Sequence, residues 1–286
     1  MPRIRVNGVE LYYELLGPAD GSPADTRPVD TRPVDTRPVE GDVIVLSNGV
    51  LMSTASWGLQ KTALSRRHRL LLYDCRGMWQ SQHPAGSYTM EQHADDLAAL
   101  LTALNIPSAH IGGISYGGEV SLAFALKYPH MTRSLIVSSL VSHSEPVLKG
   151  LVDAWIAAAR ARDPQLLFEV TYPLNFSSAY IHANQASLEA AGARYAQLDM
   201  DAVLELFDCF QRLDITTELH RITAPTLVLV GELDILKPRM YSEIIAREIP
   251  NAQLVVVPGS GHALCLEKPM VFNTLVLGFV EQLYGR

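Results

Sequence analysis

Cysteine is scarce in this chain, with three residues among 286. Cys75, Cys209 and Cys265 lie far apart in the sequence and are odd in number, which argues against a disulfide framework. No Cys-x-x-Cys or His-Glu-x-x-His motif occurs, and the nine histidines never fall at the spacing of metal ligands. We therefore expect neither a redox-active pair nor a bound metal.

Basic charge and long apolar runs are also lacking. The 23 basic residues are outnumbered by 30 acidic residues, for a formal net charge of −7, whereas binding to nucleic acid or to an anionic membrane requires clustered Lys and Arg. No run of 18 apolar residues occurs that could span a bilayer, and the first residues do not form the apolar stretch of a signal peptide. We expect a cytoplasmic protein without a membrane span or a nucleic-acid partner.

Glycine motifs that bind phosphate groups are missing as well. The sequence contains no Gly-x-x-x-x-Gly-Lys motif. Gly259-Ser260-Gly261 is followed by Leu264 at the position where a dinucleotide-binding loop requires Gly or Ala. We therefore expect no cofactor.

The sequence does contain a regular alternation of apolar runs and helical stretches, and its hydrophobic fraction of 48% is sufficient for a sizeable core. This alternation favours the α/β class, a mostly parallel sheet with helices on both faces. Strands are expected at Val9–Leu16, Asp42–Leu46, Leu70–Tyr73, Ala109–Gly112, Ser134–Ser138, Thr226–Val230 and Gln253–Val257. Helices are expected at Met90–Leu104, Gly118–Tyr128, Pro238–Glu248 and Pro269–Leu283.

The alternation is interrupted between about residues 141 and 214. This stretch has no convincing strand, but it has helical runs at Val147–Arg162, Gln165–Val170, Ser178–Gln197 and Asp201–Leu213. We interpret it as an all-helical cap inserted between two strands, above the carboxyl ends where open α/β sheets bind ligands. The predicted division is a first core segment at 1–140, a cap at 141–214 and a second core segment at 215–286.

Residues 25–39 repeat Asp-Thr-Arg-Pro-Val three times. Pro at every fifth position excludes a helix or a central strand. We expect a surface loop within the first core segment, where the entropy of loop closure penalises an insertion only weakly.

The motif Gly113-Ile114-Ser115-Tyr116-Gly117 lies between an apolar strand and an apolar helix. A tight turn in that context projects the serine above the sheet, and the glycines allow the backbones to pass closely. The helix N-terminus behind the serine helps to stabilise a developing oxyanion. Ser115 is therefore the predicted nucleophile.

A serine hydroxyl needs a base to take its proton, and the base needs an acid that fixes its tautomer. Among the nine histidines, only His262 follows a late strand and a Gly-rich loop. Asp234 lies just past the strand that ends at Val230, whereas Glu145 follows the preceding core strand and is the alternative acid. We expect the triad Ser115, Asp234 and His262, in the chain order of α/β-hydrolases.

On these motifs the chain resembles the α/β-hydrolase superfamily over nearly its whole length. The turn from Asp74 to Ser81 is similar to the family's Asp-x-Arg-Gly-x-Gly-x-Ser pattern, with Trp79 in place of the second glycine, and we expect its role to be structural. Glu267-Lys268-Pro269 resembles the family's Glu-x-Pro entry to the last helix.

The oxyanion loop departs from the family pattern, since Asn48-Gly49 stands where His-Gly is usual. The resemblance implies that the backbone N–H groups of Val50 and Tyr116 form the oxyanion hole, a role that needs no histidine side chain. We expect the Asn48 side chain to brace the loop by hydrogen bonds. Locally, this Asn-Gly loop also resembles that of bacterial hydroxyacyl-oxyacyl synthases.

These features predict a serine esterase of the carboxylesterase type that acts on a small-molecule ester. Alternatives are acyl transfer of the hydroxyacyl-oxyacyl synthase type, C–C hydrolase or haloperoxidase-like chemistry on the same triad, and a receptor that keeps only the hydrolase shape. An apolar pocket is expected beneath the cap, with the cap's charged residues pointing outward. Its candidate lining residues are aromatic, namely Trp57, Trp155, Phe168, Tyr172, Phe176 and Tyr180.

Overall fold

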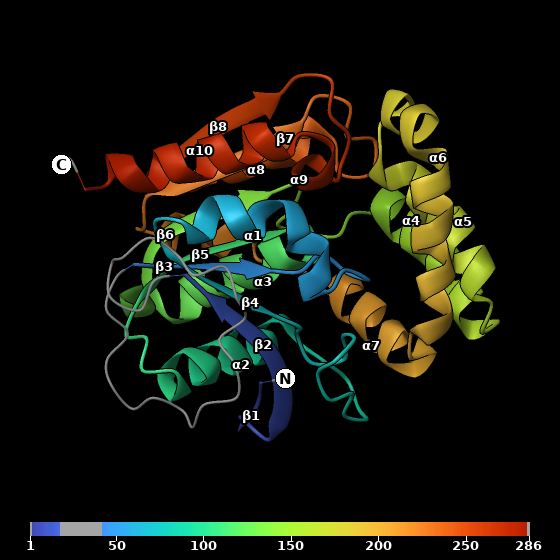
Figure 1. The fold of residues 1–286 in the computed structure, drawn as a ribbon, viewed down its shortest axis with the longest axis horizontal. Coiled ribbons are helices and arrows are strands. Elements are labelled where there is room, and N and C mark those ends of the chain that lie inside the picture. The colour runs from blue at the N-terminus through green and yellow to red at the C-terminus, as the bar shows by residue number, and fades with distance from the viewer. Residues whose placement is uncertain (1, 18–41, 285–286) are drawn as a thin grey trace.

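The computed structural model describes residues 2–17 and 42–284. The Asp-Thr-Arg-Pro-Val repeat at 25–39 lies outside these described residues. Within them, the chain forms an eight-stranded sheet covered by helices, with a group of helices beyond one end of the strands (Figure 1). The strands are β1 (Arg3–Val6), β2 (Val9–Leu16), β3 (Val43–Ser47), β4 (Arg69–Tyr73), β5 (Ala109–Ile114), β6 (Thr132–Ser138), β7 (Thr226–Gly231) and β8 (Ala252–Val257).

The strand order is β1-β2-β4-β3-β5-β6-β7-β8, in which β3 to β8 run parallel and β1 and β2 form an antiparallel edge. The predicted α/β architecture is therefore confirmed. The register pairs Ser47 of β3 with Gly113 of β5, so the loops that follow these two strands leave the sheet side by side. That edge carries the candidate site.

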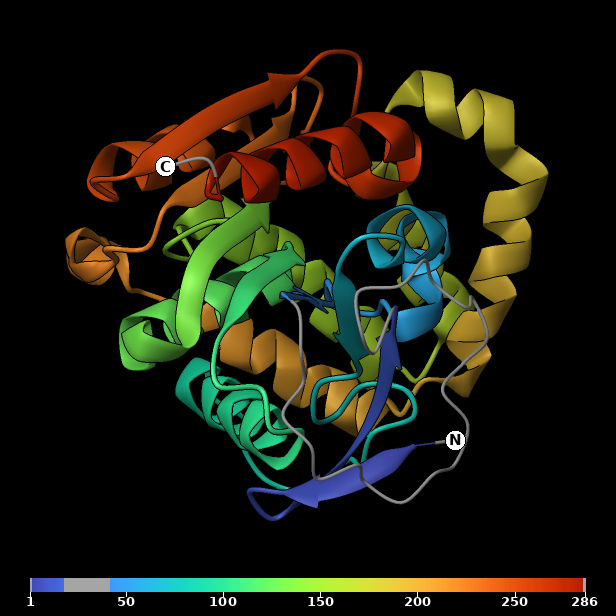
Figure 2. The same ribbon diagram turned by 60° about the vertical axis from the view of Figure 1, so that its left-hand side comes forward.

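Helices cover both faces of the sheet (Figure 2). The core helices are α1 (Gly58–Ser65), α2 (Met90–Ala103), α3 (Tyr116–Lys127), α8 (Arg239–Glu248), α9 (Leu264–Glu267) and α10 (Pro269–Gln282). A hydrophobic core lies on each face of the sheet, and the side chains of β3 point alternately into one core and the other. Ile44 and Leu46 pack with the apolar residues of α1 and α10. Val43 and Val45 pack with those of α2, α3 and α8, as the period of two in a strand requires.

The sequence analysis does not predict β1 or α1. In β1 only Val6 is buried, so this short edge strand carries almost no apolar signal. In α1 the buried residues are Gln60, Leu64 and Ser65, so a single apolar side chain marks its inner face. Both elements depend on packing against the rest of the chain rather than on an apolar pattern of their own.

The interruption in the alternation is a helical insertion between β6 and β7, as predicted. It contains α4 (Pro146–Arg160), α5 (Pro164–Asn175), α6 (Ser178–Gly192), a short 3₁₀ helix (Ala193–Gln197) and α7 (Met200–Gln211). Proline at N1 starts α4. The next three helices each begin at a residue whose side-chain oxygen accepts a backbone N–H group of the first turn: Asp163 for α5, Ser177 for α6 and Asp199 for α7. We use the word cap for this insertion, which stands beyond the sheet in Figure 1.

Candidate active site

Ser115 occupies the turn between β5 and α3 with φ 54° and ψ −121°, a backbone conformation that residues other than glycine rarely adopt. The turn is possible because its neighbours lack side chains. A Cβ on Gly113 would lie 2.4 Å from the carbonyl oxygen of Gly117, and a Cβ on Gly117 would lie 2.1 Å from that of Ser47. Backbone strain at a position that aims a hydroxyl into a cavity indicates a functional constraint.

His262 and Asp234 form a buried pair beside Ser115. Nδ1 of His262 lies 2.9 Å from Oδ2 of Asp234, and both side chains are almost fully shielded from solvent. The other carboxylate oxygen accepts the backbone N–H groups of Leu236 and Lys237 at 3.0 and 2.8 Å. A carboxylate can only accept, so Nδ1 of His262 carries the hydrogen and Nε2 is free to act as a base.

Glu145, the alternative acid, has a different partner. Its Oε1 accepts a 2.6 Å hydrogen bond from the hydroxyl of Tyr241 in α8. Among the hydrogen bonds and ion pairs of the described residues, none joins Glu145 to His262. The structure therefore brings Asp234, and not Glu145, to the histidine.

Hydrogen bonds of Asn48 hold the loop after β3 against the segment that follows β4 and against Trp57. Asn48 donates to Oδ1 of Asp74 at 2.9 Å and accepts from Nε1 of Trp57 at 2.8 Å. Asp74 also accepts the backbone N–H groups of Thr54 and Gln80. Burial raises the pKa of Asp74 to about 6, although these hydrogen bonds act in the opposite direction.

This network corrects one expectation, because Trp57 does not line the pocket. Its side chain is fully buried in the core, where it packs on Phe272 and holds Asn48. An indole N–H that is buried needs an acceptor, and the amide oxygen of Asn48 supplies it. Trp57 thus lies behind the loop that follows β3 rather than in the cavity.

The backbone N–H groups of Val50 and Tyr116 are both available for an incoming ligand. Neither donates to an acceptor within residues 2–17 and 42–284, and both residues line the same pocket as Ser115. Tyr116 begins α3, where the first N–H groups of a helix have no partner in the helix itself. This arrangement can bind a negatively charged oxygen next to the Ser115 hydroxyl.

Trp79 shows why the family's turn pattern has glycine at this place. Its φ is 40°, in the left-handed region that a bulky residue seldom occupies. Compensation comes from the side chain, whose Nε1 donates to the carbonyl oxygen of Leu51 at 3.0 Å. The ring also lines the pocket, and the guanidinium of Arg194 from the cap lies 4.6 Å from its centroid.

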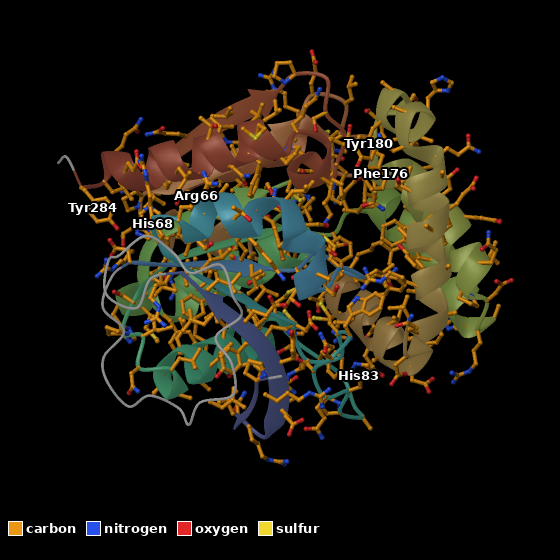
Figure 3. The ribbon with its side chains drawn as sticks, in the orientation of Figure 1. Arg66, His68, His83, Phe176, Tyr180 and Tyr284 are labelled. Carbon is orange, nitrogen blue, oxygen red and sulfur yellow. The ribbon has the colours of Figure 1, made fainter. Side chains whose placement is uncertain are left out.

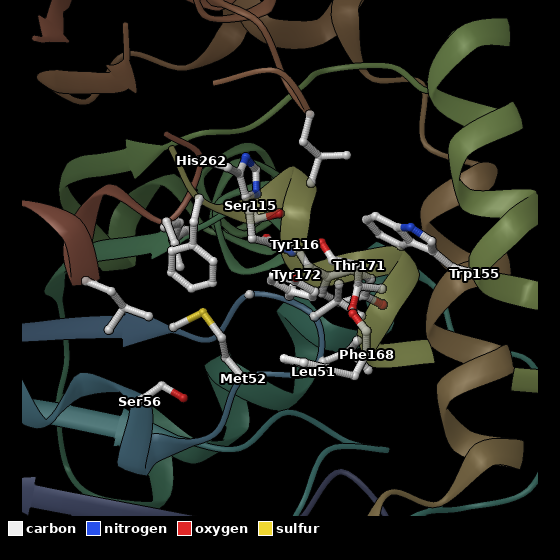
Figure 4. Close-up of a pocket in the computed structure, with 18 of the residues that line it drawn as sticks. Leu51, Met52, Ser56, Ser115, Tyr116, Trp155, Phe168, Thr171, Tyr172 and His262 are labelled. Carbon is white, nitrogen blue, oxygen red and sulfur yellow. Dashed lines mark hydrogen bonds between the residues drawn. The ribbon is translucent and has the colours of Figure 1, made fainter. Parts of the chain in front are cut away.

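The pocket itself is a cavity of about 180 Å³ between the sheet edge and the cap. Figure 4 shows Ser115 and His262 on the core side, with Trp155, Phe168 and Tyr172 on the cap side. Phe176 lines the cavity too, whereas Tyr180 does not. The outward direction predicted for the cap's charges holds for the exposed Arg160, Arg162 and Glu189, and Arg194 is an exception because it lines the cavity.

Glu267 of the Glu-x-Pro segment ties the cap to the histidine loop. Its two carboxylate oxygens accept from the backbone N–H groups of Ser177 and Gly261 and from the Ser177 hydroxyl, at 2.6–3.0 Å. Phe176 and Tyr180 stack at this junction, with ring centroids 5.1 Å apart (Figure 3). The cap is thus anchored beside the loop that carries His262.

Sequence reasoning missed one charged side chain at the centre of the site. Nζ of Lys237 donates to Oγ of Ser115 at 3.1 Å and to Oε1 of Glu119 at 2.5 Å. No hydrogen bond joins Ser115 to His262 among those of the described residues. The available signals were a glutamate inside the mostly apolar stretch of α3 and a lysine three positions after the predicted acid Asp234.

The described part of the chain contains neither a candidate metal-binding cluster nor a candidate membrane-crossing helix. No group of three or more His, Cys, Asp or Glu side chains there could hold a metal ion. None of the helices in residues 2–17 and 42–284 is both long enough and apolar enough to cross a bilayer.

The parallel sheet, the serine turn after β5 and the His–Asp pair after β8 and β7 define the class of α/β hydrolases. Comparison with known proteins agrees. The family model described as alpha/beta hydrolase fold matches residues 42–269, and the chain belongs to this family.

The chain is similar to proteins that are named as different kinds of hydrolase. The RutD protein of Pantoea ananatis, which bears the provisional name of a carbamate hydrolase, is 32% identical over 85% of this chain and 90% of its own. A crystal structure of an α/β hydrolase from a Medee basin deep-sea metagenome library has a TM-score of 0.87 at 30% identity, covering 98% of this chain and 97% of that one. A thermophilic esterase from Thermogutta terrifontis has a TM-score of 0.84 at 26% identity, covering 99% of both chains.

Proposed function

We propose that the protein is a serine hydrolase that cleaves a carboxylic ester through an acyl-enzyme on Ser115. Oγ of Ser115 attacks the carbonyl carbon while its proton passes to Nε2 of His262, and Asp234 stabilises the imidazolium that forms. The N–H groups of Val50 and Tyr116 donate to the oxyanion. His262 then protonates the leaving alcohol, and water releases the acid in a second round of the same chemistry.

One observation carries this proposal. The strained Ser115 shares a single cavity with His262 and with two backbone N–H groups that have no acceptor among the described residues. A nucleophile, a base held in one tautomer and a pair of oxyanion donors are the parts that acyl transfer to serine requires. The likeness to an esterase structure supports the same reaction class.

Hydrolysis is favoured over transfer to a second acyl group by the size of the cavity. Its volume of about 180 Å³ is close to that of an apolar cavity of about 150 Å³ that holds one benzene molecule. One short acyl group fits in such a space with a water molecule, whereas transfer to a 3-hydroxyacid needs a groove for a second chain. We therefore propose esters of short acyl groups as the preferred substrates, and uncharged acyl groups because most of the side chains that line the cavity are apolar.

A series of 4-nitrophenyl esters from acetate to decanoate tests both the activity and the chain length, and a 4-nitrophenyl carbamate tests the activity named for the RutD relative. The Ser115→Ala variant should lose on the order of 10⁶ in kcat, as in the best-studied triad. A fluorophosphonate probe should label Ser115 in the wild type, and the label should vanish in His262→Ala. Activity of Ser115→Ala within tenfold of wild type would rule the proposal out.

Whether water or a hydroxyacid accepts the acyl group from Ser115 is tested separately. An ester donor is supplied with excess 3-hydroxyacid, and the free acid and the ester dimer are both quantified. Free acid should dominate at every modest acceptor concentration. Dominance of the ester dimer would instead establish the protein as an acyltransferase.

A further inference from the structure

Lys237 is a buried cation in direct contact with the candidate nucleophile. It follows Asp234 by three positions, so its backbone N–H holds the triad acid while its side chain reaches Ser115. The residue is 4% exposed. Burying a charge is costly unless it is paired. The contacts of Lys237 must therefore offset the cost of removing its ammonium group from water.

The surroundings of Lys237 pair its ammonium group and direct it at Oγ of Ser115. Glu119, which is fully buried in α3, accepts from Nζ at 2.5 Å. The ring of Phe210 lies 4.5 Å from the same nitrogen, a distance at which the ring face attracts a cation. The carboxylate itself is held by the N–H of Val141 at 3.3 Å.

The ammonium group therefore has three neighbours that attract it: a carboxylate, an aromatic ring and the serine oxygen. The charge is already balanced by Glu119, so a substrate anion is not needed to stabilise the lysine. Of the three neighbours, only Oγ of Ser115 gains negative charge during the proposed reaction. The geometry thus directs the cation at the nucleophile rather than at a substrate carboxylate.

We infer that Lys237 is a further catalytic residue, whose ammonium group stabilises the negative charge that develops on Oγ of Ser115 as the serine loses its proton. The serine proton goes to Nε2 of His262, the Oγ–carbon bond forms, and the carbonyl electron pair moves to the oxyanion. Lys237 keeps all its protons throughout. During release of the acid, the same hydrogen bond stabilises Oγ as the leaving group.

This inference rests on the proposed function, and its test compares rates that the proposed function makes measurable. Lys237→Met removes the charge at similar length, but it leaves Glu119 buried without its cation, a change that can prevent folding. The double variant Lys237→Met/Glu119→Gln removes both charges together. Lys149→Met, at an exposed lysine of α4 in the cap, is the matched control.

The second-order rate of labelling by a neutral fluorophosphonate is measured for each variant, together with kcat and KM for neutral 4-nitrophenyl acetate and anionic 4-nitrophenyl hemisuccinate. Thermal unfolding confirms that each protein is folded. Labelling and kcat for both esters should fall on the order of 10²-fold in the double variant, the scale on which one donor to a reacting oxygen acts. KM and all values for Lys149→Met should stay within twofold of wild type.

Several results would overturn the inference. A labelling rate in the double variant that equals or exceeds the wild-type rate means that Lys237 is structural or holds the serine back. A loss confined to KM for the anionic ester means that Lys237 binds a substrate carboxylate instead. If the wild type itself is not labelled at Ser115, the proposed function fails together with the inference.

Discussion

The two walls of the pocket are held in different ways. On the core side, hydrogen bonds hold the polar side chains: Asn48, Asp74, Asp234 and Glu119 all contact a donor or acceptor on another segment. On the cap side, aromatic rings pack on one another. Phe168 stacks on Tyr172 with centroids 4.7 Å apart and meets the edge of Tyr195 at 5.4 Å.

This difference separates two tasks. Hydrogen bonds have strict geometry and lock reacting groups in place, as catalysis requires. Ring packing is less directional, so a change of one residue can reshape the cap wall without moving the serine or the histidine. We expect core-side substitutions to change the rate for every substrate and cap-side substitutions to change the choice among substrates.

The largest effect expected from this comparison is at the triad acid. Asp234→Asn replaces an acceptor of the His262 N–H by a group that can donate, which favours the wrong histidine tautomer. The value of kcat should fall by about 10⁴-fold for all esters, by analogy with the corresponding acid of serine proteases. Steady-state kinetics of wild type and Asp234→Asn across the series of 4-nitrophenyl esters measures this fall in kcat.

Glu145→Gln is the control for that prediction. Glu145 bonds to Tyr241 rather than to His262, so the variant should keep kcat within a few-fold of wild type. A larger loss in Glu145→Gln than in Asp234→Asn would reverse the assignment of the acid.

Much of the core side could be predicted from the sequence, because its signals are local. The apolar runs of β3, β4, β6 and β7 are almost fully buried and therefore read as continuous Val, Ile and Leu segments. The turn around Ser115 follows from its glycines, whose missing side chains are visible in the sequence. The partnership of Lys237 with Glu119 spans 118 positions, and no local pattern reveals it.

The second-largest effect concerns stability at the oxyanion loop. Burial raises the pKa of Asp74 from 3.8 to about 6, so between these values the folded protein holds a proton that the unfolded chain has lost. Stability from this group is therefore fully present below about pH 4 and is lost as the pH rises through 6. The change amounts to about 3 kcal/mol at most.

Asp74→Asn removes this titration. The free energy of unfolding of wild type relative to Asp74→Asn should therefore be largest near pH 4 and should shrink by up to about 3 kcal/mol by pH 7. Urea unfolding of both proteins at several pH values measures the difference, in which titrations common to both cancel. A difference that does not vary with pH would contradict the raised pKa.

The cap wall was predictable in outline only. Helical periodicity identifies α4 to α7, and four of the five aromatic candidates from the cap line the cavity, but the pattern does not distinguish them from Tyr180, which does not. Trp57 was placed wrongly for a related reason, since a tryptophan near a candidate loop can point into the core as easily as into a pocket. Trp79 lines the cavity instead, at a position that a glycine pattern made look purely structural.

The smallest effect sharpens the cap side of the comparison. Gly192 ends α6 behind Phe168, and a Cβ there would lie 2.8 Å from the phenylalanine ring. Since Tyr172 and Tyr195 pack against the ring's other sides, Gly192→Ala should move it toward the cavity. We expect kcat/KM for the hexanoate ester to fall about tenfold, the lower end of what one methylene group is worth in an apolar pocket, with the acetate ester nearly unchanged.

Gly150→Ala provides the matched control, because it makes the same substitution in another cap helix where a Cβ meets nothing within 4 Å. It should leave all esters unchanged and raise the free energy of unfolding by up to about 1 kcal/mol, since alanine favours a helix over glycine. Equal losses for acetate and hexanoate in Gly192→Ala would mean that the cap wall also positions the reacting groups. The separation between a catalytic core wall and a selective cap wall would then be wrong.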